Sequence, residues 1–222
     1  MRYIIRMLLL INMYLLFVIN SSSAQIKIGL IGGVNYSNLI NFNRYGIIRT
    51  EPSPSQIDIN KYGKTLKPGL ILSFIIDYPI SENISILTQP GLVIKKTSSN
   101  YESPAINVTD SYYSINVPLF VKYTPMRFFA FDPFLNVGLG IEHLIKATNK
   151  IGINQENEET NNYYKNNLFL LMGIGTDYSL GQSISLTIRL YYSYGLTNYS
   201  SNSPDFIRTS DIFVVTGLLY KL

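Results

Sequence analysis

The sequence predicts an all-β fold, an eight-stranded antiparallel up-and-down transmembrane β-barrel, and three observations support this prediction. From Ser183 to Leu196 apolar residues alternate without a break with small or polar ones, which describes a strand with one strongly apolar face. Seven other stretches show related patterns, and the connections between the stretches are alternately long and short. Tyrosines also gather near the ends of these stretches, on the apolar side.

The eight stretches are long enough to cross a bilayer at a tilt, which takes about 9–11 residues per strand. They are Lys27–Leu39, Leu66–Tyr78, Ile84–Lys96, Tyr112–Tyr123, Phe131–His143, Leu168–Tyr178, Ser183–Leu196 and Asp211–Leu222. The connections at 79–83, 124–130 and 179–182 are short, whereas those at 40–65, 97–111, 144–167 and 197–210 are long. Outer-membrane barrels have short periplasmic turns and longer extracellular loops, so this order would put both termini in the periplasm.

The individual stretches differ in how clearly they alternate. The first, Lys27–Leu39, is rich in glycine and is the weakest, although glycines on an inner face permit the tight curvature of a small barrel. In the fourth, the odd-numbered residues from Tyr113 to Tyr123 are apolar and are expected to face outward, opposite inward residues such as Lys122. In the fifth, Phe131, Leu135, Val137, Leu139 and Ile141 oppose Asp132, Asn136, Gly138, Gly140 and Glu142.

The first 24 residues have the pattern of a cleaved signal peptide. Arg2 and Arg6 precede an apolar run from Met7 to Ile19, and small residues ending at Ala24 form a cleavage site. A membrane anchor is the alternative, but this run is too short to span a bilayer comfortably. The expected mature domain is therefore residues 25–222, which contains no cysteine to carry a lipid anchor or form a disulfide.

The charge of the chain does not predict a nucleic-acid partner. The net charge of +4 falls to +2 when Arg2 and Arg6 leave with the signal peptide. The remaining basic residues are dispersed along the chain and form no basic patch in the sequence.

Tyrosine is the most distinctive residue type, with 18 tyrosines and no tryptophan. One set lies at or near the ends of even-numbered stretches, and a second set lies toward the opposite rim. The sets are Tyr78, Tyr123, Tyr178 and Tyr220, and Tyr36, Tyr113, Tyr192 and Tyr194. Although tyrosine is also a good strand former, the shared face and depth of the first set favour aromatic girdles at the two membrane interfaces.

Charged residues on the expected inner face need partners, because unpaired ions removed from water are costly. They are Asp77, Lys95, Lys122, Asp132, Glu142, Asp177, Arg189 and Lys221. Eight strands leave an interior just wide enough for side chains to fill, which favours a mutually neutralising polar plug over a proton or ion path. Arg189 is the expected hub, since a guanidinium group can bind two carboxylates at once.

No enzymatic site is predicted. The only histidine, His143, follows Glu142, and adjacent strand residues point to opposite faces, so Glu142 is poorly placed to orient it. The sequence contains no metal-ligand cluster, phosphate-binding loop or nucleophile motif, so no catalytic residue, metal or cofactor is expected.

Three segments carry a resemblance to a known family: Ile28–Leu39, Ser85–Val93 and Ile115–Tyr123. They are similar to the first, third and fourth strands of the PorT-type outer-membrane β-barrel family, known as the outer membrane protein beta-barrel domain, although Asn116 stands where an acidic residue is common. Gly217–Leu222 resembles the terminal signal that the barrel-assembly machinery reads, although it ends in leucine. The resemblance covers nearly the whole mature chain and implies an eight-stranded barrel in a Gram-negative outer membrane.

The expected function is that of a non-enzymatic integral outer-membrane protein with a structural or surface-interaction role. Outer-membrane lipids and, during insertion, the barrel-assembly machinery are the expected partners. The polar segment Lys146–Asn167, which we expect to be mobile, and the 40–65 loop would hold any specificity. An accessory factor for protein secretion is the alternative that the PorT resemblance implies. A narrow channel and a soluble lipocalin-like ligand-binding barrel also remain open.

Overall fold

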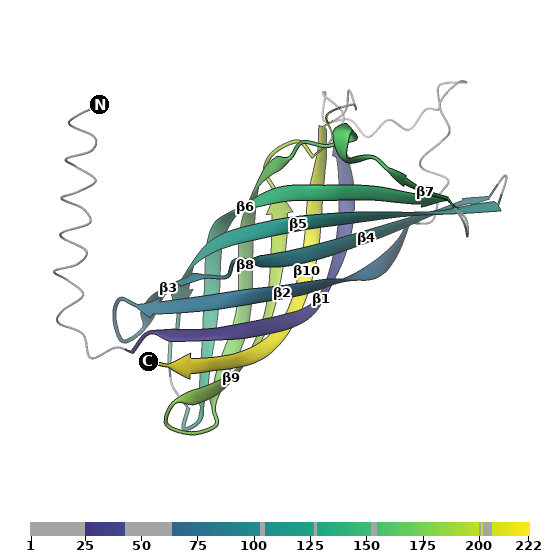
Figure 1. The fold of residues 1–222 in the computed structure, drawn as a ribbon. Coiled ribbons are helices and arrows are strands. Elements are labelled where there is room, and N and C mark those ends of the chain that lie inside the picture. The colour runs from purple at the N-terminus through teal and green to yellow at the C-terminus, as the bar shows by residue number, and fades with distance from the viewer. Residues whose placement is uncertain are drawn as a thin grey trace, which may run out of the picture.

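The described part of the chain forms an antiparallel sheet of ten strands and a short 3-10 turn (Figure 1). The computed structural model describes residues 25–42, 64–102, 105–126, 128–151, 155–199, 201 and 206–222. The elements are β1 (Lys27–Phe42), β2 (Lys64–Pro79), β3 (Ile84–Thr88), β4 (Gly91–Glu102), β5 (Ala105–Tyr123), β6 (Phe131–Ile151), β7 (Gln155–Glu158), η2 (Thr160–Asn162), β8 (Asn166–Ser179), β9 (Ile184–Gly195) and β10 (Phe206–Lys221). In this part of the chain no helix is long and apolar enough to cross a membrane.

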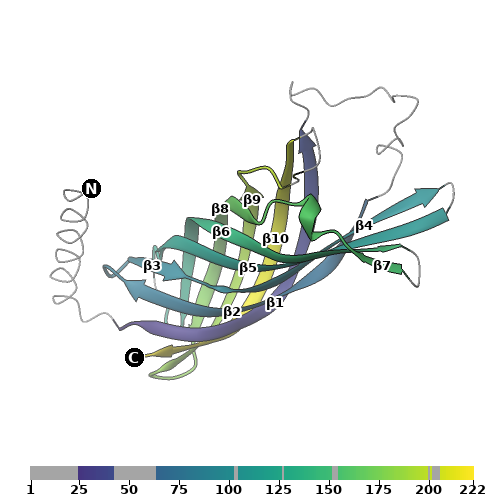
Figure 2. The ribbon, with the colours of Figure 1, turned by 45° about the horizontal axis from the view of Figure 1, so that its top comes forward.

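Antiparallel pairing runs from strand to strand around the sheet and returns to its start. β1 pairs with β2 on one side and with β10 on the other, in a register that places Lys27 opposite Lys221 and Phe42 opposite Phe206. The sheet consequently curves round on itself, as Figure 2 shows. Next to these paired ends the backbone N–H of Leu222 donates to the carbonyl of Ile26 at 2.9 Å. The predicted all-β, antiparallel, up-and-down architecture is confirmed.

The strand count differs from the prediction of eight. β3 and β4 both pair with β2 and β5, so the expected stretch Ile84–Lys96 is one run interrupted at Gln89 and Pro90. Proline lacks the N–H that a ladder requires, which explains the break, although the Pro90 carbonyl still accepts a hydrogen bond from Phe74 N at 2.9 Å. The four-residue strand β7, which pairs with the far end of β6, is the other addition.

Two connections predicted as long loops are largely strand. β4 and β5 continue to Glu102 and Ala105, and β6 continues to Ile151, so the 97–111 connection is a long hairpin that projects beyond the rest of the sheet (Figure 1). Polar sequence carries little alternation there, which hides the strands. The segment Lys146–Asn167, expected to be mobile, also contains β7 and η2. Residues 43–63 of the 40–65 loop and the expected signal peptide lie outside the described residues.

Burial alternates along the strands with apolar residues on the outside. On β9, Arg189 is 1% exposed whereas its neighbours Ile188 and Leu190 are 49% and 46% exposed. Most of the large outward-facing side chains of the wall are thus aliphatic, and the inner face combines an apolar core around Ile75, Leu87 and Phe120 with charged groups. The soluble lipocalin-like alternative requires the reverse, with the aliphatic residues inside and Arg189 in water.

Candidate functional site: a filled interior and a covered mouth

The first feature of the interior is an ion cluster centred on Lys122. The Lys122 Nζ lies 2.7 Å from Asp77 Oδ2 and 2.7 Å from Asp177 Oδ2, and all three side chains are buried. The half-buried Lys27 adds a second cation, 3.3 Å from Asp177 Oδ2. These residues come from β5, β2, β8 and β1, so the cluster ties distant parts of the wall together across the interior.

Arg189 is not the hub that the sequence predicts. Its Nη2 atom lies 3.9 Å from Asp177 Oδ1, its Nε donates to Thr187 Oγ1 at 3.0 Å, and its guanidinium carbon lies 5.1 Å from the centroid of the Phe134 ring. The reason is position. β5 lies between β2 and β8 in the pairing order, so Lys122 reaches a carboxylate on either side. Arg189 on β9 lies next to β8, and in the described structure Asp177 is its one carboxylate within 4.0 Å.

A second ion cluster is centred on Lys95. Its Nζ lies 2.6 Å from Glu142 Oε2 and 2.8 Å from Asp211 Oδ2, and the three side chains are buried. Asp211 is absent from the predicted set because the inward residues that follow it on β10, Phe213 and Val215, are apolar. Asp211 and Lys221 are an even number of residues apart on β10, so their side chains share the inner face of the sheet. That spacing is the signal that could have identified Asp211.

Asp132 is one of two predicted interior residues, the other being Lys221, that form no described ion pair with either cluster. The Asp132 side chain is half-buried, and the register of β6 and β8 places it opposite Asp177. The described ion pairs do not include Asp132.

Aromatic rings fill the space between the two ion clusters. Phe120, Tyr191 and Phe213 each lie two residues along a strand from a charged member, namely Lys122, Arg189 and Asp211. Tyr191 stacks on Phe213 with ring centroids 4.7 Å apart, and contacts Phe120 edge-on at 6.1 Å. Gln89 Nε2 donates to the Tyr191 hydroxyl at 3.1 Å. The interior therefore consists of ions, rings and ions in succession.

Three tyrosines cover one end of the interior, and we call them the tyrosine cover. Tyr112, Tyr163 and Tyr199 contact one another with ring centroids 5.2–5.5 Å apart, and the Tyr112 and Tyr163 hydroxyls are 3.2 Å apart. Leu144 and Ala147 of β6 complete this cluster. Because burial strips water from its hydroxyl, the pKa of Tyr199 is held well above its usual value.

Loop backbone holds the tyrosine cover in place. The N–H of Tyr164 donates to the carbonyl of Tyr199 at 3.0 Å, and the N–H of Ser201 donates to the carbonyl of Asn162 at 3.0 Å. These bonds join the segment after β7 to the segment after β9. Sequence reasoning missed the tyrosine cover, because Tyr163 and Tyr199 lie in aperiodic segments that carry no pattern to read.

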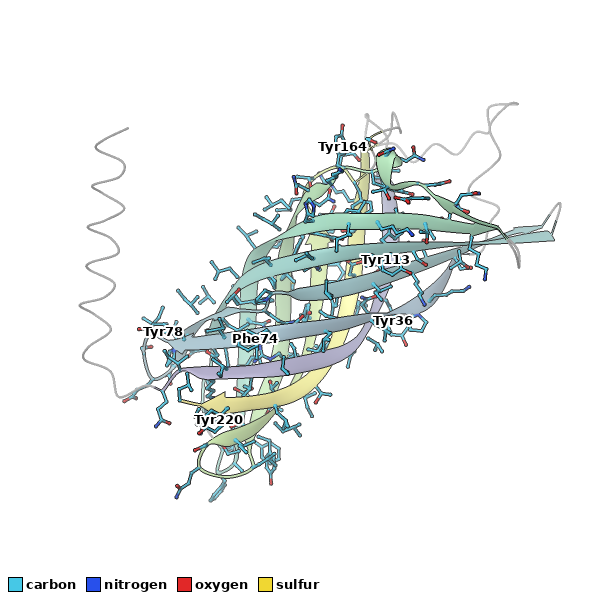
Figure 3. All side chains as sticks on the ribbon, in the orientation of Figure 1. Tyr36, Phe74, Tyr78, Tyr113, Tyr164 and Tyr220 are labelled. Atoms are coloured by element: carbon cyan, nitrogen blue, oxygen red, sulfur yellow. The ribbon has the colours of Figure 1, made fainter. Side chains whose placement is uncertain are left out.

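The tyrosines predicted to form girdles lie on the outer face. Figure 3 shows Tyr36 and Tyr113 toward one end of the sheet, Tyr78 and Tyr220 toward the other, and Phe74 between them. Exposed members are Tyr36, Tyr123 and Tyr220, and half-buried members are Tyr78, Tyr113, Tyr178, Tyr192 and Tyr194. Two of them have polar partners, since Tyr192 Oη lies 2.8 Å from Ser210 Oγ and Tyr194 Oη accepts from Arg208 Nη1 at 2.9 Å.

His143 and Glu142 lie on opposite faces. His143 is exposed with its Nδ1 2.8 Å from Asn166 Oδ1, whereas Glu142 is buried in the Lys95 cluster. Within the described ranges no group of three or more His, Asp and Glu side chains is arranged to hold a metal ion. The charged groups that the fold does bring together are ion pairs linking strands.

Comparison with solved structures shows the same type of fold. The chain is similar to the outer membrane protein OprG from Pseudomonas aeruginosa, with a TM-score of 0.53 and 13% identity over 90% of this chain and 96% of that one. It is also similar to Neisserial surface protein A (NspA), with a TM-score of 0.52 and 11% identity over 90% of this chain and 98% of that one. At these identities the likeness concerns the fold alone.

Sequence comparison identifies the family. No curated protein sequence matches the chain. The family model described as the outer membrane protein beta-barrel domain matches residues 20–201, which is most of the chain. The PorT-type assignment is finer than this match and stays a prediction. Together with the aliphatic outer face and the polar, ion-paired interior, the match shows that this chain belongs to the outer membrane protein beta-barrel domain family.

Proposed function

We propose that the protein is a closed, non-enzymatic barrel of the Gram-negative outer membrane, with a structural or surface-interaction role at the cell surface. The observation that carries the proposal is the filled interior. Lys122 and Lys95 each bridge two carboxylates across the lumen, aromatic rings lie between them, and the tyrosine cover lies over one end. A lumen filled in this way serves the stability of the wall and leaves the outer surface and the loops for interaction.

In this proposal β3 and β4 count as one crossing and β7 lies outside the membrane, so the wall has eight crossings. The ends with short turns, at 80–83 and 180–183, face the periplasm together with both termini. The β4–β5 hairpin, β7 and the tyrosine cover face the medium.

Planar bilayer recordings test whether the lumen is closed. We expect the reconstituted full-length chain to give no steady conductance, whereas an open porin reconstituted in the same way gives step increases. The variant Lys95→Ala/Lys122→Ala, which removes both bridging side chains, serves as an internal comparison and is expected to leak more than the native chain. Steady open-channel currents from the native chain would support the narrow-channel alternative instead.

Epitope insertion tests the orientation. An epitope inserted after Glu102, at the tip of the β4–β5 hairpin, should bind antibody on intact cells. The matched insertion after Gly181, in a short turn, should bind antibody only after the outer membrane is permeabilised. The opposite result would reverse the proposed orientation, and binding at both sites only after permeabilisation would remove the surface role.

A further inference from the structure

Three lysines lie together on the outer wall, and we call them the lysine ridge: Lys67 of β2, Lys96 of β4 and Lys146 of β6. Register places them on one face. Lys67 pairs directly opposite Lys96, and side chains of paired residues share a face of the sheet. Lys96 lies two residues beyond Ile94 and four beyond the exposed Leu92, so it continues the outward set of β4.

The third lysine joins the lysine ridge through β5. Lys146 pairs opposite Tyr113, which itself pairs with Ile94, the outward neighbour of Lys96. The Lys67 Nζ donates to Thr109 Oγ1 of β5 at 2.9 Å, so its ammonium group passes over β4 toward β5. Three cations from β2, β4 and β6 therefore lie around the outward side chains of β5.

The lysine ridge lies where the apolar band of the wall ends. The last exposed aliphatic residues before it are Leu70 on β2 and Ile115 on β5, which are 58% and 40% exposed, and Ile145 directly precedes Lys146. Tyr113 lies at the same level, near the end of the sheet that carries Tyr36 (Figure 3). In a membrane this level is the headgroup layer, where lysines reach outward from an apolar surface.

Among the described residues, no acid forms an ion pair with the lysine ridge. In the part of the chain that the structure describes, no carboxylate lies within 4.0 Å of Lys67, Lys96 or Lys146. Three cations at headgroup depth fit a negatively charged group that the membrane itself supplies.

From this placement we propose that the lysine ridge binds the phosphate group of an anionic membrane lipid in the leaflet that surrounds the Tyr36 and Tyr113 end. The inference rests on the proposed membrane location. A lipid fits better than a soluble anion because the ridge borders the aliphatic band, so one molecule can place its chains on Leu92 and Ile115 and its phosphate among the lysines.

The test is lipid titration of the refolded full-length protein in micelles of a neutral detergent, read by native mass spectrometry. The probes are phosphatidylglycerol and, as the headgroup control with the same chains, phosphatidylcholine. The variant Lys96→Gln/Lys146→Gln removes two ridge charges. The matched control, Lys27→Gln/Lys221→Gln, removes two charges far from the ridge, because Lys27 and Lys221 pair with each other at the opposite end of the sheet.

We expect the native chain to prefer phosphatidylglycerol and the ridge variant to bind it about 30-fold more weakly, at about fivefold per lysine. Phosphatidylcholine binding should not change, and the control variant should stay within about twofold of the native chain. Equal losses of phosphatidylglycerol binding in the two variants would overturn the proposed lipid site on the lysine ridge. A native chain that binds the two lipids equally well would also overturn it. The same samples are run unboiled on a gel, and absence of a heat-modifiable band would overturn the proposed membrane barrel and the ridge with it.

Discussion

Replacing Lys122 with methionine tests whether the interior ion pairs stabilise the wall. The change removes the cation that lies 2.7 Å from both Asp77 and Asp177. Asp177 keeps Lys27 at 3.3 Å and Arg189 at 3.9 Å, whereas Lys122 is the ion-pair partner of Asp77 in the described structure. One buried carboxylate is therefore orphaned, which costs about 3–5 kcal/mol of unfolding free energy.

The same reasoning predicts which second change restores stability. Lys122→Met/Asp77→Asn removes both members of the orphaned pair and should recover most of the loss, whereas Lys122→Met/Asp177→Asn should recover less. Lys95→Met should cost at least as much as Lys122→Met, because it leaves Glu142 and Asp211 together without their shared cation.

Urea titration of protein refolded in phosphatidylcholine vesicles measures these differences. The folded fraction at each urea concentration is read from the gel band that keeps its mobility when unboiled. A Lys122→Met variant within about 0.5 kcal/mol of the native chain would refute the reasoning, since surface-type ion pairs have that small value. Equal rescue by the two asparagine variants would refute the assignment of Asp77 as the orphan.

Three further predictions follow from packing and exposure. Gly140→Ala should destabilise by about 1–3 kcal/mol in the same urea titration, because its added Cβ would lie 2.4 Å from the Phe169 ring, whereas Gly181→Ala has nothing within 4 Å and should be neutral. Tyr199→Phe should leave hydrogen exchange of the tyrosine cover unchanged or slower, because the buried hydroxyl has no hydrogen-bond partner in the described structure, and faster exchange would show that a partner was lost. Leu139→Arg, on the outer face, should cost about 2–4 kcal/mol in vesicles if the site lies near the bilayer midplane, whereas Leu180→Arg in a short turn should be tolerated; equal tolerance would mean that Leu139 does not face lipid.

The wall of the fold was predictable because its two faces meet different surroundings. Alternation such as that of Ile188, Arg189 and Leu190 records directly which side chains face out, and the observed exposures follow it. Where both faces of a strand are polar, as between Thr97 and Glu102, the alternation disappears and the strand cannot be read from periodicity. The break at Pro90 is readable from chemistry, although a single proline does not show whether a strand ends or continues.

Partners across the interior were beyond the reach of the sequence. Inward parity identifies Lys122, Asp77 and Asp177 as interior residues, but which of them meet depends on how the sheet curves and where each strand lies in the order. The guanidinium group of Arg189 is better suited than an ammonium group to bind two carboxylates at once. Lys122 nevertheless forms the centre of the cluster, because its strand places it closer to both Asp77 and Asp177. The contacts of Tyr199 depend on the path of a loop, and no local pattern encodes that path.

The most direct test of the account is the fate of the exposed aliphatic face. Cell fractionation followed by gel electrophoresis of boiled and unboiled samples locates the chain and reports whether it forms a closed, heat-modifiable barrel. We predict recovery from the outer-membrane fraction with a clear mobility shift on boiling and a strand-rich circular dichroism spectrum. Recovery as a soluble periplasmic protein with no such shift would contradict the account, because residues such as Leu139 and Leu190 would then face water.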